Sequence, residues 1–172
     1  MNRGGAKPTA LRKATDLLAR QDHSEKRLRE KLARQGYDGD EIDEAIDRLK
    51  GCHYLDDERA CGHQFGYLYE NSSMSQRQIV QKLAARGFSI DTINNEAHDD
   101  EESRERELNA ARKAFNQKFR RAEMPEDEGE RFKAREKMKA FLYRRGFDLD
   151  ICETVYSEWV DRMRLIRTES MI

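Results

Sequence analysis

The densest group of potentially reactive side chains lies between residues 52 and 63. It comprises Cys52, His53, Cys61 and His63. Thiolates and imidazoles are the ligands that zinc prefers, but this spacing matches neither the Cys-x-x-Cys nor the His-x-x-x-His pattern of known zinc sites. The adjacent Cys52 and His53 can also hardly reach one ion together. We therefore expect no metal here, with Cys61 packed on a helix that begins near Asp57 and His53 in a loop.

The rest of the chain shows no motif of an enzyme. A Gly-rich phosphate loop, a His-Glu-x-x-His helix and a nucleophile elbow are all absent, and Gly4-Gly5 stands alone near the N-terminus. Cys152 recurs at a position that is isoleucine elsewhere in the chain, so we expect a small core residue rather than a reactive thiol. The sequence predicts no catalytic residue, no cofactor and no enzymatic activity.

One pattern does recur, and it organises the whole chain. Leu-x-x-x-Gly-aromatic occurs at Leu32 to Tyr37, Leu83 to Phe88 and Leu142 to Phe147. Each copy closes one helical pattern and opens another. Since only glycine adopts a left-handed conformation at low steric cost, we expect Gly36, Gly87 and Gly146 to end helices with positive φ. Tyr37, Phe88 and Phe147 should anchor these turns.

Apolar residues at helical spacing surround each copy. Leu28, Ile79 and Met138 lie four residues before the leucines and share a helix face with them. Ser24 and Ser75 are expected to cap these helices at their N-termini, with Gln78 completing a capping box at Ser75. The helices that follow the glycines are expected to begin at the N-caps Asp40, Asp91 and Asp150.

The sequence therefore predicts an all-α fold of three tandem three-helix repeats, stacked in an elongated, curved array. With 37% hydrophobic and 39% charged residues, the chain suits several thin cores better than one thick core. The expected divisions are a disordered N-terminal tail (1–9), repeat 1 (10–55), repeat 2 (56–103), repeat 3 (104–167) and a C-terminal tail (168–172).

The aromatic residues allow two interpretations. Phe115, Phe119, Phe132, Phe141 and Trp159 could stack on bases if they were exposed beside basic residues. Their helical spacing and repeat equivalence favour core positions instead.

The sequence indicates a cytoplasmic protein. It has no run of about 18 apolar residues that could span a bilayer and no signal-like apolar segment at its N-terminus. Three cysteines are an odd number, which fits a reducing compartment better than a disulfide scaffold. We expect a monomer without membrane contact.

Charge is unevenly distributed, although the net charge is only −1. Residues 104–121 carry 7 basic and 2 acidic side chains, and residues 131–145 carry 7 and 1, whereas residues 123–130 carry only acidic charges. A local excess of Lys and Arg is what contact with phosphates or with an acidic protein groove requires. The alternative is a solvated helix surface with intrahelical ion pairs.

Three segments resemble the RecX family, the bacterial regulators of the RecA recombinase. They are Asp22-His-Ser-Glu-Lys-Arg-Leu-Arg-Glu-Lys-Leu, Tyr54-Leu-Asp-Asp-Glu-Arg-Ala and Phe141-Leu-Tyr-Arg-Arg-Gly-Phe. The resemblance spans roughly residues 10 to 160. It departs from the family at Asn71-Ser-Ser-Met74, where a glycine is common, and in the polar last helix of the second repeat.

The resemblance implies a non-enzymatic protein that binds along the groove of the RecA filament on DNA, with possible contact to the DNA itself. Such a protein inhibits strand exchange, ATP hydrolysis and co-protease activity. The alternative is a stand-alone helical DNA-binding or architectural module. The predicted partner-binding residues are Arg27, Lys31, Arg34, Lys82, Arg86, Lys133, Lys137, Arg144 and Arg145.

Overall fold

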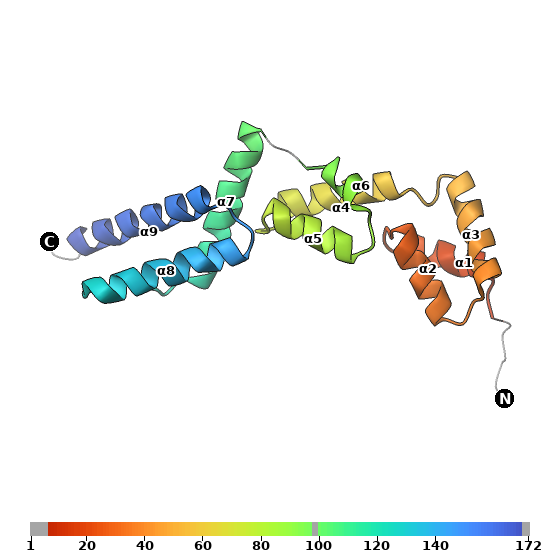
Figure 1. The fold of residues 1–172 in the computed structure, drawn as a ribbon, viewed down its shortest axis with the longest axis horizontal. Helices are drawn as coiled ribbons and strands as arrows, with labels where there is room; N and C mark the ends of the chain where they lie inside the picture. Colours follow the sequence, from red (N-terminus) through yellow and green to blue (C-terminus); the bar gives the residue numbers. More distant parts are fainter. Residues whose placement is uncertain (1–6, 98–99, 170–172) are drawn as a thin grey trace, which may run out of the picture. The chain divides into compact units, whose positions relative to one another are not determined.

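The computed structural model describes residues 7–97 and 100–169, and every regular element in these ranges is a helix (Figure 1). This confirms the predicted all-α class. The elements are α1 (Ala10–Leu18), α2 (Glu25–Arg34), α3 (Gly39–Gly51), α4 (Asp57–Asn71), α5 (Gln76–Ala85), α6 (Ile90–Asn94), α7 (Glu101–Lys118), α8 (Glu128–Arg144) and α9 (Leu149–Glu169).

Three glycines end α2, α5 and α8 in the way their spacing predicted. Gly36, Gly87 and Gly146 have φ values of 77°, 92° and 84°. In each turn the N–H of the aromatic residue after the glycine donates to the carbonyl of the leucine five positions earlier, as Tyr37 does to Leu32 at 3.3 Å. This pattern is the Schellman motif, which satisfies carbonyls at a helix end. Tyr37, Phe88 and Phe147 are buried, as turn anchors must be.

The N-caps predicted for α2 and α5 are correct, whereas those predicted for α3, α6 and α9 are wrong. Ser24 caps α2, and Ser75 exchanges hydrogen bonds with Gln78 in a capping box. The helices α3 and α6, however, are capped by Asp38 and Ser89, and α9 begins at Leu149. The predicted caps are therefore wrong by two residues. Asp40, Asp91 and Asp150 lie in the first turns, where a carboxylate interacts favourably with the helix dipole.

Contacts divide the chain into two compact units. The first unit runs up to Tyr67 and includes Val80–Glu96, and the second comprises Leu68–Ile79 and everything from Ala97 onward. The division falls inside the second predicted repeat. The repeat boundaries given above stay a prediction, and α7 begins three residues before the expected start of repeat 3. The polar segment after Phe88 forms only the five-residue helix α6.

Each unit has its own apolar core. In the first unit, α1 and α3 pack around Leu28, Leu32 and Ile46, which are fully buried. In the second unit, the core of α7, α8 and α9 includes Phe115, Leu142, Phe147, Cys152 and Trp159. Cys152 is thus the small core residue that the repeat predicted.

Phe132 is the exception among the five aromatic residues expected in a core, because its side chain is 61% exposed. It lies in the first two turns of α8, beyond the part of that helix that packs on the core. Helical spacing alone cannot indicate where along a helix the packing stops.

The structure describes only part of each predicted tail. Thr9 caps α1, Lys7 donates to the Gly36 carbonyl at 2.7 Å, and the Tyr37 hydroxyl donates to the Pro8 carbonyl at 2.7 Å. At the other end, α9 continues through residues 168 and 169. Residues 1–6 and 170–172 lie outside the described part of the chain.

A recurring joint connects consecutive helix pairs inside each unit. In the first unit, the hydroxyl of Ser24 donates to the carbonyl of Arg86 at 2.7 Å, beside Gly87. In the second unit, the hydroxyl of Ser75 donates to the carbonyl of Arg145 at 2.6 Å, beside Gly146. Both serines are almost fully buried. A single serine therefore caps its own helix and holds the C-terminus of a helix far away in the sequence.

A carboxylate completes each joint. Asp57 accepts a hydrogen bond from the backbone N–H of Glu25 at 2.8 Å, and Glu107 accepts one from the N–H of Gln76 at 2.7 Å. These N–H groups belong to the first turn of a helix, where donors have no partner within the helix. Burial raises the pKa of Glu107, and the hydrogen bond from Gln76 opposes this rise.

The joint predicts a difference between two variants of Glu107. Glu107→Ala removes the acceptor of the Gln76 N–H and should lower the free energy of unfolding by about 1–3 kcal/mol. Glu107→Gln keeps an oxygen at that position and should cost clearly less. Urea denaturation followed by circular dichroism measures both. Equal losses would show that the charge, rather than the hydrogen bond, stabilises the joint.

Candidate partner-binding surfaces

Five of the nine predicted partner-binding residues lie in the first unit. Arg27, Lys31 and Arg34 lie on α2. Lys82 lies on α5 and Arg86 directly after it, within residues 80–96 of the same unit. Glu30 stands between two of the arginines, 3.0 Å from Arg27 and 3.4 Å from Arg34. These ion pairs are solvent-exposed, so they hold the arginines only weakly.

A shallow hollow of 190 Å³ brings Arg27, Lys31 and Arg86 together. Lys31 Nζ lies 3.1 Å from His23 Nε2, and Arg86 donates to the Gln64 side chain at 2.5 Å. Burial, together with the charges of Lys31 and Arg27, lowers the pKa of His23. The imidazole is therefore neutral at pH 7 and accepts a hydrogen bond from Lys31. The sequence did not single out His23 and Gln64, which hold two of the cations in place.

This arrangement predicts a loss of stability in mild acid. Because the pKa of His23 is lower in the folded state than in the unfolded state, the unfolded chain binds the proton more readily. The contribution of His23 to stability is present above pH 6.5 and is lost as the pH falls through the lowered pKa. His23→Gln should remove this pH dependence between pH 7 and pH 5, measured by urea denaturation. An unchanged slope would assign it to other groups.

The remaining four predicted residues lie in the second unit. Lys133, Lys137 and Arg144 are exposed and follow each other at i, i+4 and i+11 on α8, which places them on one helix face. Within the ranges that the structure describes, none of the three forms an ion pair. We call these three residues the outer face of α8.

The other side of α8 has paired cations instead. Glu153 of α9 accepts from Arg135 at 2.7 Å and lies 2.5 Å from Lys139. These two partners lower the pKa of Glu153, with the hydrogen bond from Lys139 as the largest cause. The helix therefore neutralises its cations toward α9 and leaves those of the outer face without carboxylate partners.

Arg145 is less exposed than a partner-binding residue is expected to be. Its side chain is half-buried, its guanidinium carbon lies 5.4 Å from the centre of the Phe141 ring, and its Nε is buried without a hydrogen-bond partner in the described structure. Its equivalent, Arg86, has Gln64 as a partner. Ala114 precedes Phe115 where Gln64 precedes Phe65, so the corresponding acceptor is missing. Arg145 belongs to the joint rather than to the outer face.

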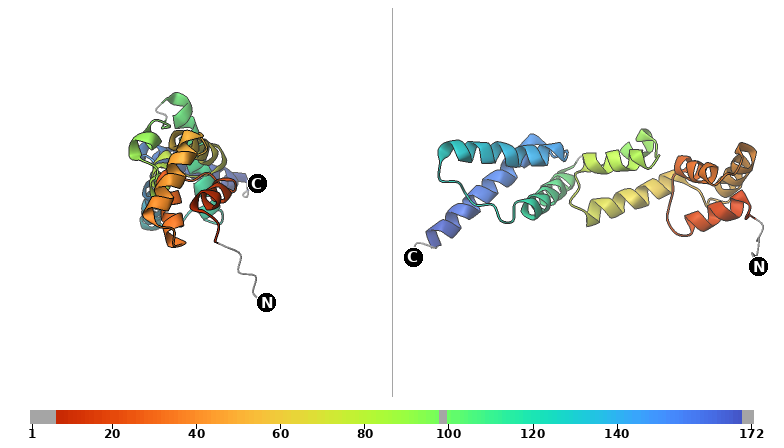
Figure 2. Two further views of the ribbon diagram at one scale, coloured as in Figure 1. Left: turned by 90° about the vertical axis from the view of Figure 1, so that its right-hand side faces the viewer. Right: turned by 90° about the horizontal axis from the view of Figure 1, so that it is seen from below.

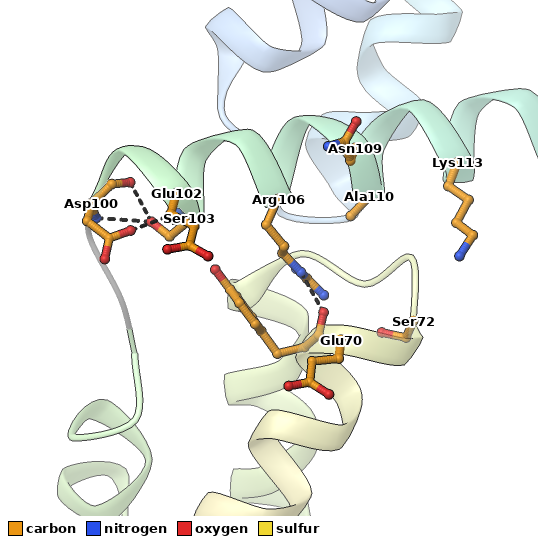
Figure 3. A pocket seen from close by; sticks show the side chains of 10 residues that line it. Glu70, Ser72, Asp100, Glu102, Ser103, Arg106, Asn109, Ala110 and Lys113 are labelled. Atoms are coloured by element: carbon orange, nitrogen blue, oxygen red, sulfur yellow. Dashed lines mark hydrogen bonds between the residues drawn. The ribbon is translucent and has the colours of Figure 1, made fainter.

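A hollow beside α7 is occupied by a side chain that holds the unit together. A pocket in the second unit is lined by the last turn of α4 and by α7, with Arg106 reaching across it (Figure 3). Arg106 donates to the carbonyls of Tyr69 at 2.6 Å and Met74 at 2.8 Å, and it pairs with Glu107. Its donors are thus used within the unit, in contrast to the outer face of α8.

The Cys and His side chains of residues 52–63 lie in different surroundings. Cys61 is fully buried, and burial raises the pKa of its thiol to about 11. Cys52 and His63 are exposed, and His53 ends α3 with a positive φ of 54°. In residues 7–97 and 100–169 no three His, Cys, Asp or Glu side chains are placed to hold a metal ion.

None of the helices in these ranges is long and apolar enough to cross a membrane.

Comparison with known proteins assigns the chain to a family. Two models of RecX domains match: the first three-helix domain over residues 10–49 and the third over residues 105–156. The regulatory protein RecX of Chromobacterium violaceum is 30% identical over 149 residues, which cover 87% of this chain and 90% of that protein. RecX of Actinobacillus pleuropneumoniae is 29% identical over 86% of this chain and 97% of its own length.

The fold agrees with a solved structure. The crystal structure of RecX from Lactobacillus salivarius superposes with a TM-score of 0.67, at 16% identity, over 91% of this chain and 95% of that one. The two matched domains coincide with α1 to α3 and with α7 to α9, whose glycine turns the sequence predicted. The chain belongs to the RecX family.

Proposed function

We propose that this protein regulates a RecA recombinase by binding along the groove of its filament on DNA. In this proposal it inhibits strand exchange, ATP hydrolysis and co-protease activity, and it catalyses no reaction itself. Membership of a family of regulatory proteins supports the general role. The observation that carries the binding mode is the outer face of α8, where three exposed cations have no carboxylate partner in the described structure.

Two separate basic surfaces support binding to a repetitive partner. The first unit offers Arg27, Lys31 and Arg34, and the second offers the outer face of α8. When two weak contacts engage one assembly, the second contact forms at high effective concentration, so the total affinity exceeds that of either. A filament of identical subunits near DNA phosphates presents the same negative groups many times, which suits such a distribution.

Co-sedimentation with RecA tests this function. We expect the protein to sediment with RecA when ATP and single-stranded DNA are present, and to bind bare duplex DNA weakly at physiological salt. It should also suppress the DNA-dependent ATP hydrolysis of RecA. Equally strong binding to bare duplex, with no effect on ATP hydrolysis, would favour a stand-alone DNA-binding module.

A further inference from the structure

The last two helices are longer than their counterparts elsewhere in the chain. α8 has 17 residues and α9 has 21, whereas α2 and α5 have 10 each and α3 has 13. When Gly146 is aligned with Gly36, the additional residues are 128–134 at the start of α8 and 162–169 at the end of α9. The glycine turns at Gly36 and Gly87 form without such extensions. The repeat fold therefore does not require them.

A groove between α8 and α9 includes residues of both extensions. α8 and α9 diverge away from the turn that joins them (Figure 2, right). Between them lies a cavity of 420 Å³ with an apolar floor of half-buried side chains. The floor residues are Met124, Tyr156, Val160 and Met163. No residue of α7 is among the described residues that line this cavity. Its lining comes from α8, α9 and Met124 of the segment between α7 and α8.

Arginines surround this floor. They are Arg131, Arg135, Arg164 and Arg167, and the rim also includes Asp161 and Glu153, of which Glu153 accepts from Arg135 at 2.7 Å. Arg167 pairs with Glu126 at 3.1 Å and Arg164 with Asp161 at 3.5 Å, and all four of these side chains are at least 60% exposed. Exposed pairs of this kind contribute little to stability and exchange readily with other partners. Among the described residues, the one hydrogen-bond partner of the Arg131 side chain is the backbone carbonyl of Pro125, at 2.7 Å.

We infer that this groove is a docking site for an acidic amphipathic helix of a partner protein. Guanidinium groups bind carboxylates through two parallel hydrogen bonds, so the rim selects Glu and Asp. The apolar floor selects a segment that also has a hydrophobic face. The lining residues of α9 run from Glu153 to Arg167, which is about 21 Å of helix and matches about four turns of a partner.

Two other occupants fit less well. A nucleic acid offers phosphates to the arginines but no aliphatic side chains to cover Met163 and Val160. A second copy of this chain would have to supply an acidic amphipathic helix. The helix α3 is of this kind, but its apolar residues Ile42, Ile46 and Leu49 are buried in the core of the first unit. The partner is therefore a different protein, and this inference does not depend on the identity of the recombinase.

Fluorescence polarisation with a synthetic peptide tests the inference. The probe is a labelled peptide of about 15 residues, with leucines at i, i+3, i+4 and i+7 and glutamates at most other positions. We expect the full-length protein to bind it with a Kd of about 10–100 µM. A peptide of the same composition in scrambled order, and one with glutamine in place of glutamate, should each bind at least about tenfold more weakly. Equal binding of all three peptides would overturn the inference.

Variants of the protein locate the binding. Arg164→Glu combined with Arg167→Glu should weaken peptide binding at least about tenfold. Ser157→Glu places a negative charge in the groove at an exposed position and should weaken it as well. The matched control, Lys133→Glu with Lys137→Glu, changes the same charge on the outer face of α8 and should leave the affinity within about twofold. Circular dichroism should show unchanged helix content for all variants.

Three further results would refute the docking site. One is an equal loss of peptide affinity in the control variant, which would indicate nonspecific attraction. Another is competition by a single-stranded oligonucleotide as effective as by unlabelled peptide. The third is a concentration-dependent dimer in sedimentation velocity that Arg164→Glu with Arg167→Glu dissolves.

Discussion

Reversing the outer face of α8, by Lys133→Glu, Lys137→Glu and Arg144→Glu together, is expected to abolish suppression of RecA's DNA-dependent ATP hydrolysis. All three side chains are exposed and make no ion pair in the described structure, so the fold should tolerate the change. Each substitution replaces attraction to a negative groove with repulsion, and like charges across an interface cost several kcal/mol. Circular dichroism and the urea midpoint should stay as in the wild type.

A matched control separates a specific face from the general charge. Lys118, Arg120 and Arg121 at the end of α7 are also exposed and basic, and they are absent from the predicted partner-binding set. Their replacement by glutamate changes the net charge by the same amount. This variant should inhibit RecA nearly as well as the wild type. If it fails equally, net charge rather than the outer face determines binding.

Arg145 is left out of this variant for a structural reason. Its carbonyl accepts the hydrogen bond of Ser75, and its half-buried side chain lies near Phe141. A glutamate there would disturb the joint and confuse loss of folding with loss of binding.

The first unit should contribute separately. Reversing Arg27 and Arg34 is expected to weaken inhibition without abolishing it, because one of two contacts remains. Inhibition by the wild type should also decline as added salt shortens the Debye length below about 8 Å. An inhibition that is insensitive to both changes would argue against electrostatic binding by the first unit.

The sequence predicted local features well because they depend on neighbouring residues. The positive φ of Gly87 and the cap at Ser75 follow from steric freedom at glycine and from a side-chain oxygen near free N–H groups. Asp40 was misplaced as a cap because several polar residues follow the glycine turn. The choice of Asp38 depends on which residue is extended when the chain leaves that turn.

Features that depend on residues far apart in the chain could not be predicted from the sequence. The partners Ser24 and Arg86 are 62 positions apart, and nothing in their local sequence indicates that they meet. The exposure of Phe132 likewise depends on where the packing on α8 stops, and the Arg145 Nε is buried at the joint with Ser75. The density of basic residues in the sequence pointed to Lys133, Lys137 and Arg144. It could not show that the neighbouring Arg145 is half-buried and lies apart from these three.

Replacing each of the three turn glycines by alanine should lower the free energy of unfolding, and the loss should be larger at Gly87 and Gly146, which lie in the joints, than at Gly36. All three have positive φ, so each substitution should cost about 1–2 kcal/mol from backbone strain. A Cβ at Gly87 would lie 2.8 Å from the hydroxyl oxygen of Ser24, and one at Gly146 would lie 2.8 Å from that of Ser75. At Gly36 the nearest atom is the end of the flexible Lys7 side chain, 3.9 Å away.

The joints should therefore add about 1–3 kcal/mol to the loss at Gly87 and Gly146, because the clash displaces a buried hydrogen bond. Two signals distinguish the units. Trp159 is the single tryptophan and lies in the second core, so its fluorescence reports unfolding of the second unit, whereas circular dichroism reports both. Gly146→Ala should shift the fluorescence transition to lower urea. Gly87→Ala should shift mainly the dichroism transition. Equal losses at all three glycines would mean that the strain is local and that the serine contacts contribute little to holding the helix pairs together.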